Sequence, residues 1–326
     1  MTGLSDSFQR PINYLRISVT DRCNLRCVYC MPESGIALMS HYDILSYEEI
    51  FSIVKAAAEL GITRVRLTGG EPLVRAGLPD LVALIAGIET IEDISLTTNG
   101  ILLAQYAVEL KEVGLRRVNV SLDTLKPETF RKITRCGTLK KTLEGIAAAE
   151  QAGLTPVKIN TVVMAGVNDD ELADFAKKTV NDGWNVRFIE LMPSSANEPV
   201  SGKLVPVSEM KKRVETLGKL EPASIEAGNG PAKYFRLPGA KGTIGFISPV
   251  TEHFCFQCNR LRLTADGKLR PCLLSDDEID LKAPLRGGAP AEELKKLIAQ
   301  AIACKPKGHR LAEGATKGRP FSQVGG

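Results

Sequence analysis

Three cysteines stand close together near the start of the chain. Cys23, Cys27 and Cys30 follow the spacing C-x3-C-x2-C, so one short loop carries all three thiols. A structural zinc site closes with four protein ligands, whereas three thiolates leave one iron of a cubane cluster open to a small molecule. The count favours an iron–sulfur cluster, and a zinc loop completed by a distant residue is the alternative.

A second incomplete set of cysteines lies in the last quarter of the chain. Cys255, Cys258 and Cys272 are spaced C-x2-C-x13-C. Beside the first set, these three thiols predict a second cubane cluster, whose open iron could bind a substrate nitrogen or oxygen. The alternative is a zinc knuckle with His253 as the fourth ligand.

The composition is that of a globular protein. The 326 residues are 44% hydrophobic, and the formal charge of +4 suits an anionic small molecule as well as a weak nucleic-acid contact. No apolar run reaches the roughly 18 residues of a membrane span, and the start lacks a secretory pattern, so we expect a cytoplasmic enzyme. Disulfides are disfavoured in the cytoplasm. Two cysteines outside both sets, Cys136 and Cys304, are predicted to be ordinary buried thiols.

The elements that must position these cysteines follow a βα pattern. Over roughly the first 190 residues, short apolar runs alternate with amphipathic stretches, as in successive βα units around a parallel sheet. Because six units are fewer than the eight of a closed TIM barrel, we expect an α/β fold with a partial (β/α)6 barrel. The predicted strands are Tyr14–Thr20, Arg64–Leu67, Asp93–Thr97, Arg117–Ser121, Pro156–Val162 and Asn185–Glu190.

Helices are expected between the strands. The clearest begins at Ser46, which forms a capping box with Glu49, and ends at Gly61. The others are Leu78–Ile88, Leu102–Val113, Leu139–Ala152 and Asp170–Asp182.

After Met192 the pattern changes to a β-rich extension. We therefore predict a barrel over residues 1–192 and a carboxyl-terminal domain over 193–326 that carries the second cysteine set. We expect a short helix near Val207–Leu217 and a final amphipathic helix near Ala291–Ala303. Between them, β-like segments are expected around Tyr234–Leu237, Gly242–Ile247 and Leu261–Arg270.

Several cations lie where they could bind a polyanion. Arg66, Lys158 and Arg187 lie at or near the carboxyl ends of separate predicted strands, where they would converge. Arg260 and Arg262 alternate along a predicted strand, so they point to one face beside the second cysteine set.

Eight segments then carry a resemblance, in order and spacing, to a known family. They are Arg16–Cys23, Arg66–Pro72, Thr97–Gly100, Asn119–Asp123, Lys158–Asn160, Phe188–Pro193, Cys255–Leu263 and the terminal Gly325-Gly326. With Tyr29 before the last cysteine of the first loop and the Gly69-Gly70-Glu71-Pro72 turn, these segments resemble the GTP 3',8-cyclase family of molybdenum cofactor synthesis, within the radical S-adenosylmethionine superfamily. The resemblance covers about residues 8 to 326.

The resemblance implies an activity and cofactors. Members of this family are lyases that abstract the ribose 3' hydrogen of GTP and join C3' to C8, giving (8S)-3',8-cyclo-7,8-dihydroguanosine 5'-triphosphate. The implied cofactors are two [4Fe-4S] clusters and S-adenosylmethionine, with GTP held between the clusters.

The resemblance also implies site residues. The metal ligands would be Cys23, Cys27, Cys30, Cys255, Cys258 and Cys272. The cosubstrate would contact Tyr29, Gly70, Ser121 and Met192, and GTP would contact Arg16, Arg66, Thr97, Lys158, Arg260, Leu261 and Arg262. The predicted catalytic residues are Arg260 and Arg262, from the motif of the second cysteine set, and Gly325 and Gly326. The two glycines are included because the family's Gly-Gly terminus reaches the active site.

The predicted partners are GTP and S-adenosylmethionine, with no membrane and no nucleic acid. The family implies a homodimer, flavodoxin or ferredoxin as electron donor, and hand-off of the product to cyclic pyranopterin monophosphate synthase. Two other functions stay open: another two-cluster radical S-adenosylmethionine enzyme acting on a peptide or RNA, and a zinc-stabilised nucleic-acid-binding protein. Against the latter, aromatic residues are only 5% of the chain.

Overall fold

The computed structural model describes residues 4–193, 202–224, 230–309 and 319–324. Six parallel strands form its amino-terminal part, each hydrogen-bonded to the next along the chain. They are β1 (Tyr14–Ser18), β2 (Arg64–Thr68), β3 (Asp93–Thr98), β4 (Arg117–Ser121), β5 (Lys158–Val163) and β6 (Asn185–Glu190). Each lies within two residues of its predicted bounds, and the predicted open α/β barrel is confirmed.

The carboxyl-terminal part adds strands to both edges of this sheet. β10 (Arg260–Leu263) pairs in parallel with β1, and β9 (Thr243–Ile247) pairs in parallel with β6. Antiparallel strands extend the edges further: β11 (Lys268–Arg270), β12 (Ile279–Asp280), β8 (Lys233–Arg236) and β7 (Glu221–Pro222). In the described residues one sheet runs in the order β12-β11-β10-β1-β2-β3-β4-β5-β6-β9-β8-β7. The β-rich extension thus continues the barrel sheet, and the boundary at residue 192 stays a prediction.

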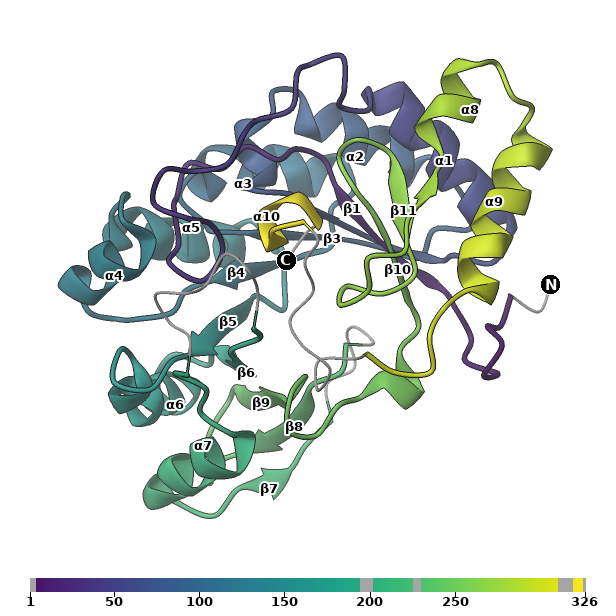
Figure 1. Cartoon of the computed structure of the whole chain (residues 1–326). Coiled ribbons are helices and arrows are strands. Elements are labelled where there is room, and N and C mark those ends of the chain that lie inside the picture. The colour runs from purple at the N-terminus through teal and green to yellow at the C-terminus, as the bar shows by residue number, and fades with distance from the viewer. Residues whose placement is uncertain (1–3, 194–201, 225–229, 310–318, 325–326) are drawn as a thin grey trace.

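Helices cover the outer face of the sheet (Figure 1). The predicted capping box opens α1 (Tyr47–Glu59): the Glu49 N–H donates to Ser46 Oγ at 3.2 Å, and the Ser46 N–H donates to Glu49 Oε2 at 2.7 Å. The other expected helices are α2 (Leu78–Ala86), α3 (Leu103–Glu112), α5 (Leu139–Gln151), α6 (Leu172–Asn181), α7 (Val207–Val214) and α9 (Ala291–Ala303).

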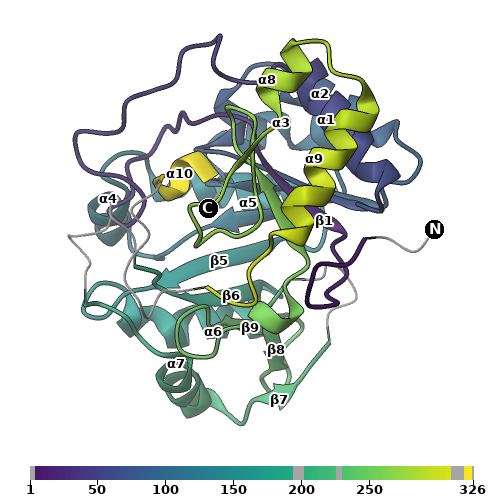
Figure 2. The same cartoon turned by 45° about the vertical axis from the view of Figure 1, so that its right-hand side comes forward.

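Three short helices in the described part of the chain were not predicted. They are α4 (Pro127–Thr134), α8 (Lys282–Arg286) and α10 (Phe321–Val324). None exceeds eight residues, which is too short for a helical periodicity to stand out in the sequence. Two of them matter for the site: α4 lies beside the first cysteine loop, and α10 lies over the inner side of the sheet (Figures 1 and 2).

Apolar side chains pack between the sheet and the helices. The ring of Phe188 on β6 lies 6.3 Å from that of Phe175 on α6 and 5.9 Å from that of Phe246 on β9. All three side chains are buried, and each such burial stabilises the fold by roughly 1.5–3 kcal/mol. Because successive strand residues alternate between faces, this packing leaves the inner face to the polar residues.

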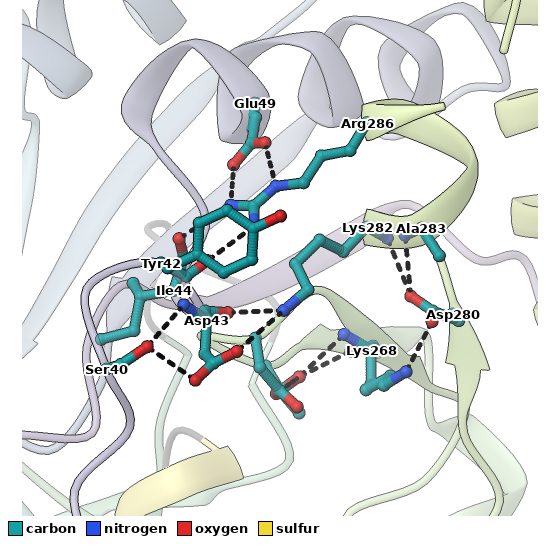
Figure 3. Close-up of polar contacts among 12 residues, drawn as sticks. Ser40, Tyr42, Asp43, Ile44, Glu49, Lys268, Asp280, Lys282, Ala283 and Arg286 are labelled. Atoms are coloured by element: carbon teal, nitrogen blue, oxygen red, sulfur yellow. Dashed lines mark hydrogen bonds and ion pairs between the residues drawn. The ribbon is translucent and has the colours of Figure 1, made fainter. Parts of the chain in front are cut away.

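Figure 3 shows how the segment after the first cysteine loop is attached to the carboxyl-terminal part. Arg286 of α8 forms a bidentate ion pair with Glu49, at 2.6 and 3.0 Å, although the two lie 237 positions apart in the chain. The same guanidinium donates to the carbonyls of Tyr42 and Ile44 at 2.6 and 3.2 Å. The path of the chain after Cys30 is therefore fixed by a helix far along the sequence.

Candidate active site

The two cysteine sets lie at opposite ends of the sheet. The loop with the first set follows the carboxyl end of β1. Cys258 precedes β10, which runs parallel to β1, and Cys272 follows β11, which runs antiparallel to β10. Both therefore lie toward the amino-terminal end of β1, and the inner face of the sheet extends from one set to the other.

The segment that begins with α4 holds the first cysteine loop. The backbone N–H groups of Arg26 and Val28 donate to the carbonyls of Thr134 and Ile133 at 3.0 and 2.9 Å. Arg135, which adopts a positive φ of 60°, donates from Nη1 to the carbonyl of Arg26 at 2.9 Å. The loop is thus tied by backbone contacts to an element that sequence reasoning missed.

The two cysteines outside the sets are not the buried thiols that the sequence predicted. Cys304 caps the carboxyl end of α9 and is exposed. Cys136 is half-buried, and its Sγ donates to the carbonyl of Asn24 in the first cysteine loop at 3.4 Å. Each follows the end of a helix, where the side chain is no longer directed into the core.

Glu71 links the first cysteine loop to two strand ends. Its carboxylate is buried, accepting from Thr98 Oγ1 at 2.7 Å and from the Asn99 N–H at 2.6 Å. Asn99 Nδ2 in turn donates to Asn24 Oδ1 at 2.7 Å. Burial raises the pKa of Glu71 to about 7, although these hydrogen bonds lower it. The turn after β2, the turn after β3 and the cysteine loop therefore form one buried polar network.

Gly70 packs directly against the chain that leads into the cysteine loop. Its N–H donates to the carbonyl of Thr20 at 2.7 Å, and a Cβ at this position would stand 2.3 Å from the carbonyl oxygen of Arg22. The close backbone contact by itself requires glycine here, whether or not the cosubstrate also touches it.

We expect Gly70→Ala to displace the first cysteine loop, because the backbone it strikes cannot rotate away as a side chain can. Iron at the first site should be lost and cleavage of S-adenosylmethionine should fall by at least about 100-fold, as shifts of about 1 Å can do. Iron content and 5'-deoxyadenosine yield measure this. Gly87→Ala is the control, since the nearest atom to its Cβ lies at 3.4 Å. Parental iron content and cleavage in the Gly70 variant would contradict this account.

The predicted cosubstrate residues gather at the same end of the sheet as the first cysteine loop. Ser121 ends β4, Met192 follows the end of β6, and Gly70 follows β2. Tyr29 donates from its hydroxyl to Asp123 Oδ2 at 2.7 Å, while Asp123 Oδ1 accepts from a β5 backbone N–H at 2.8 Å. Burial raises the pKa of Asp123 to about 6. Asp123, to which the sequence assigned no role, is the partner that orients Tyr29.

The first three thiols fit a bound metal cluster. Burial raises the pKa of Cys23 to about 12, that of Cys30 to about 11 and that of Cys27 well above its usual value. Such thiols stay protonated at neutral pH unless a metal binds them as thiolates. The donor set of three half-buried thiols on one loop is therefore suited to a cluster with one open iron.

Cationic side chains occupy the inner face between the cysteine sets. Strand residues alternate, so these side chains point away from the helices. Register sets Arg262, Arg16 and Arg66 side by side across β10, β1 and β2. The full set, here called the inner cations, is Arg16, Arg66, Arg117, Lys158, Arg187 and Arg262.

The inner cations lie deeper in the sheet than the sequence predicted. Lys158 is the first residue of β5, and Arg66 and Arg187 lie within β2 and β6, so the prediction that they lie at or near carboxyl strand ends was wrong. Periodicity gives the face of a strand but not the depth of a residue in the sheet. Thr97 pairs with Asn119, the register neighbour of Lys158, so the predicted nucleotide residues do come together.

Burial and mutual repulsion lower the pKa values of several inner cations. Burial, followed by Arg187, lowers the pKa of Lys158 to about 7, and burial lowers that of Arg66 to about 10. Burial, followed by Arg262 and Arg66, holds the pKa of Arg16 well below its usual range. A bound polyanion would relieve this repulsion, so the inner face is suited to a triphosphate.

The second cysteine set lies beside the start of β10. Arg260 is the first residue of that strand, with its guanidinium 5.0 Å from the ring centre of Phe254. Although burial opposes ionisation of Cys258, Arg260 and Lys305 lower the pKa of this thiol to about 6. The Leu261 side chain is buried in the core on the opposite face, so its contact with a nucleotide would have to come from the backbone.

The zinc alternative for the second set requires His253 as its fourth ligand. Among the described residues, no three His, Cys, Asp or Glu side chains are arranged to hold one metal ion. The ring of His253 instead packs edge-on against that of His309, with centroids 5.4 Å apart.

Helix α10 brings the end of the described chain to the inner face. Ser322 is buried, and its backbone and hydroxyl lie against the Cys30 thiol. Arg262 Nη1 donates to the carbonyl of Val324 at 3.3 Å. The resemblance implies that the terminus of the chain reaches the active site, although it names neither Ser322 nor Val324, and these two contacts place the described end of the chain on the inner face.

Arg319 anchors this segment to the β10–β11 turn. It donates to both carboxylate oxygens of Asp266, at 2.9 and 2.8 Å, and to Glu278 at 2.8 Å. Gly325 and Gly326 lie outside the described residues, so their catalytic role stays a prediction.

Comparisons with known proteins cover almost the whole chain. The Radical SAM superfamily profile matches residues 17–179, and the Molybdenum Cofactor Synthesis C profile matches residues 184–311. A GTP 3',8-cyclase of Pelotomaculum thermopropionicum is 55% identical over 325 residues, covering 99% of this chain and 100% of the relative. The chain belongs to the GTP 3',8-cyclase family. A second member, from Moorella thermoacetica, is 54% identical over 323 residues, with 99% and 100% coverage.

Membership of the GTP 3',8-cyclase family agrees with the fold. The crystal structure of Streptococcus suis SuiB bound to precursor peptide SuiA has a TM-score of 0.63 and 12% identity, covering 96% of this chain and 70% of that one. At this identity the likeness shows the fold alone. The cyclase family uses iron–sulfur clusters and S-adenosylmethionine, which confirms the predicted cofactors.

Proposed function

We propose that the chain converts GTP to (8S)-3',8-cyclo-7,8-dihydroguanosine 5'-triphosphate in molybdenum cofactor synthesis. One observation supports this most strongly: the inner cations lie on the sheet face that joins two three-cysteine sets. A triphosphate there would have the cosubstrate end of the sheet on one side and the second set on the other. The full-length relatives named GTP 3',8-cyclase carry the same activity in their names.

At the carboxyl end of the sheet, this chain's residues would bind and orient S-adenosylmethionine. The thiolates of the two cysteine sets would hold [4Fe-4S] clusters, which would supply the electron that cleaves the sulfonium of S-adenosylmethionine and an open iron for the guanine. Tyr29, fixed by Asp123, would set the position of the cosubstrate against the loop, and Glu71 keeps that loop in register with the strand ends. These contacts would hold the reacting atoms at a defined distance from GTP.

In the middle of the sheet, Arg66 and Lys158 would bind the phosphates and Arg16 would lie beside them. Arg260 and Arg262 share one face of β10 next to the second cysteine set, where they would orient the base and sugar. The Val324 carbonyl at Arg262 and Ser322 at Cys30 support a role of the terminal segment in excluding water from this region.

The anaerobically reconstituted protein should form 5'-deoxyadenosine and the cyclised nucleotide in matched amounts when given dithionite, S-adenosylmethionine and GTP. Omission of GTP should abolish the product and leave at most slow, uncoupled cleavage. Cleavage of S-adenosylmethionine that does not respond to GTP but responds to a peptide or an RNA would favour another two-cluster radical S-adenosylmethionine enzyme. No cleavage, with zinc bound in place of iron, would favour a zinc-stabilised nucleic-acid-binding protein.

The remaining partners are proposals on family grounds. They are a homodimer, a flavodoxin or ferredoxin as electron donor, hand-off to cyclic pyranopterin monophosphate synthase, and a cytoplasmic location. In the described part of the chain, no helix is long and apolar enough to cross a membrane.

A further inference from the structure

The chain that leaves α9 passes along the second cysteine set. Residues 305–309, here called the collar, begin with Lys305, a lysine that is only 3% exposed. A Cβ on Gly308 would stand 3.8 Å from that of Cys255, and His309 Nε2 lies 2.8 Å from the carbonyl of Pro249. The collar therefore borders the set, although more than thirty residues separate it from Cys272 in the sequence.

Lys305 connects the two chain segments that carry Cys258 and Cys272. Its Nζ donates to the carbonyl of Arg260 at 2.7 Å and to that of Pro271 at 2.6 Å. The first carbonyl lies two residues after Cys258, and the second directly precedes Cys272. One buried ammonium thus fixes the spacing between two predicted ligands.

Arg10 fixes the third predicted ligand to the same collar. Its Nη1 donates to the carbonyl of Cys255 at 2.5 Å, and its Nη2 donates to the carbonyl of Pro306 at 2.7 Å. Arg10 is buried and ion-paired with Asp6 at 2.6 Å, so its charge is balanced locally. Among the described residues, the Lys305 ammonium donates to two carbonyl oxygens and is ion-paired with no carboxylate, and the carbonyls that it contacts belong to the segments of Cys258 and Cys272.

A buried ammonium without a carboxylate is costly unless another negative group balances it. The negative groups beside Lys305 would be the thiolates of the second site. We propose that Lys305 is a positioning residue of the second cluster: it fixes the segments bearing Cys258 and Cys272 and supplies the positive charge that their thiolates require. This rests on the proposed function only in assuming a cluster at that site.

The test compares Lys305→Met with the parent in holoenzyme reconstituted without oxygen. Methionine keeps the length of the side chain and removes the ammonium. Iron and sulfide per chain, the rate of iron release to a chelator, and substrate-free cleavage of S-adenosylmethionine are measured. Lys296→Met is the matched control, because Lys296 lies on α9 with its side chain 77% exposed.

We expect the variant to hold about half of the parent's iron, or to release that half about 10–100-fold faster, as loss of a partner outside the ligand shell does. Cleavage at the first site should stay near the parental rate. Parental iron content with parental release kinetics would overturn the proposal, as would equal loss from both sites, which indicates general unfolding. A parent that holds zinc at the second set would refute the proposed function instead.

The variant Lys305→Gln separates the two effects of Lys305, its hydrogen bonds to the two carbonyls and its positive charge. Glutamine keeps donor hydrogens but loses the charge, so iron retention should fall between the parent and Lys305→Met. Retention equal to the parent would overturn the charge part of the proposal, and a loss of both clusters in Lys305→Gln would overturn all of it.

Discussion

Replacing Cys27 with alanine is expected to reduce cleavage of S-adenosylmethionine to background. Cys27 lies between the other two cysteines of the loop, and without its thiol only two thiolates would remain for a cluster that needs three. No product should form, because the cosubstrate has lost the iron that binds it. Yield of 5'-deoxyadenosine with dithionite, with and without GTP, is the measurement.

Cys272→Ala is the matched variant at the other end of the sheet. It should leave some uncoupled cleavage, since the first loop shares no ligand with β11, but no cyclised nucleotide. Product formation at equal rates in the two variants would contradict the division of labour between the sets. Cys304→Ala, at the exposed cysteine, should behave as the parent does.

Lys158→Met is expected to weaken GTP binding by about 10–100-fold, the loss typical of one charged hydrogen bond. The pH dependence is more specific. Burial, then Arg187, Arg117 and Arg66, lower the pKa of Lys158 to about 7, while Asp93 opposes them. GTP binds the protonated ammonium, so above pH 7 each binding event must also take up a proton.

Affinity for GTP should therefore fall as the pH rises from about 7 to 9, by up to about tenfold per unit. Phosphate groups, with a second pKa near 6, are ionised throughout this range, so they do not supply the slope. Anaerobic titration calorimetry without S-adenosylmethionine measures the affinity for GTP at each pH. Lys158→Met should bind weakly at every pH with a flat profile, and a slope that persists in this variant would assign the proton to another group.

Much of the fold could be predicted because it rests on alternation. The bounds predicted for β4 and β6 matched to the residue, since polar and apolar residues largely alternate along each run. Helix α4 could not be predicted in the same way, because Pro127 to Thr134 shows too few turns to reveal a period. The extension was predicted as β-rich, but no local pattern says that β9 and β10 pair at opposite edges of one sheet.

In the site, too, local spacing could be predicted from the sequence, whereas the depth of a residue in the sheet could not. Cys23 through Cys30 stand on one loop, so their spacing alone indicated the chemistry, and family motifs selected Tyr29 and Gly70. Depth in the sheet is set by strand register, which the sequence does not contain, and Lys158 was therefore placed at the wrong end of its strand.

Contacts between distant segments were missed for the same reason. Asp123 reaches Tyr29 across 94 positions, and Lys305 reaches Arg260 across 45. Neither residue carries a local signal beyond its type: a buried carboxylate and a buried lysine are informative only once their burial is known.

The most direct test of the account is metal analysis of the protein purified without oxygen. Two open cubane clusters predict about eight irons and about eight sulfides per chain, with a brown colour and little zinc. Iron that falls to about half in Cys27→Ala and in Cys272→Ala alike would assign one cluster to each set. Stoichiometric zinc, bound at either set with full protein coordination, would contradict it.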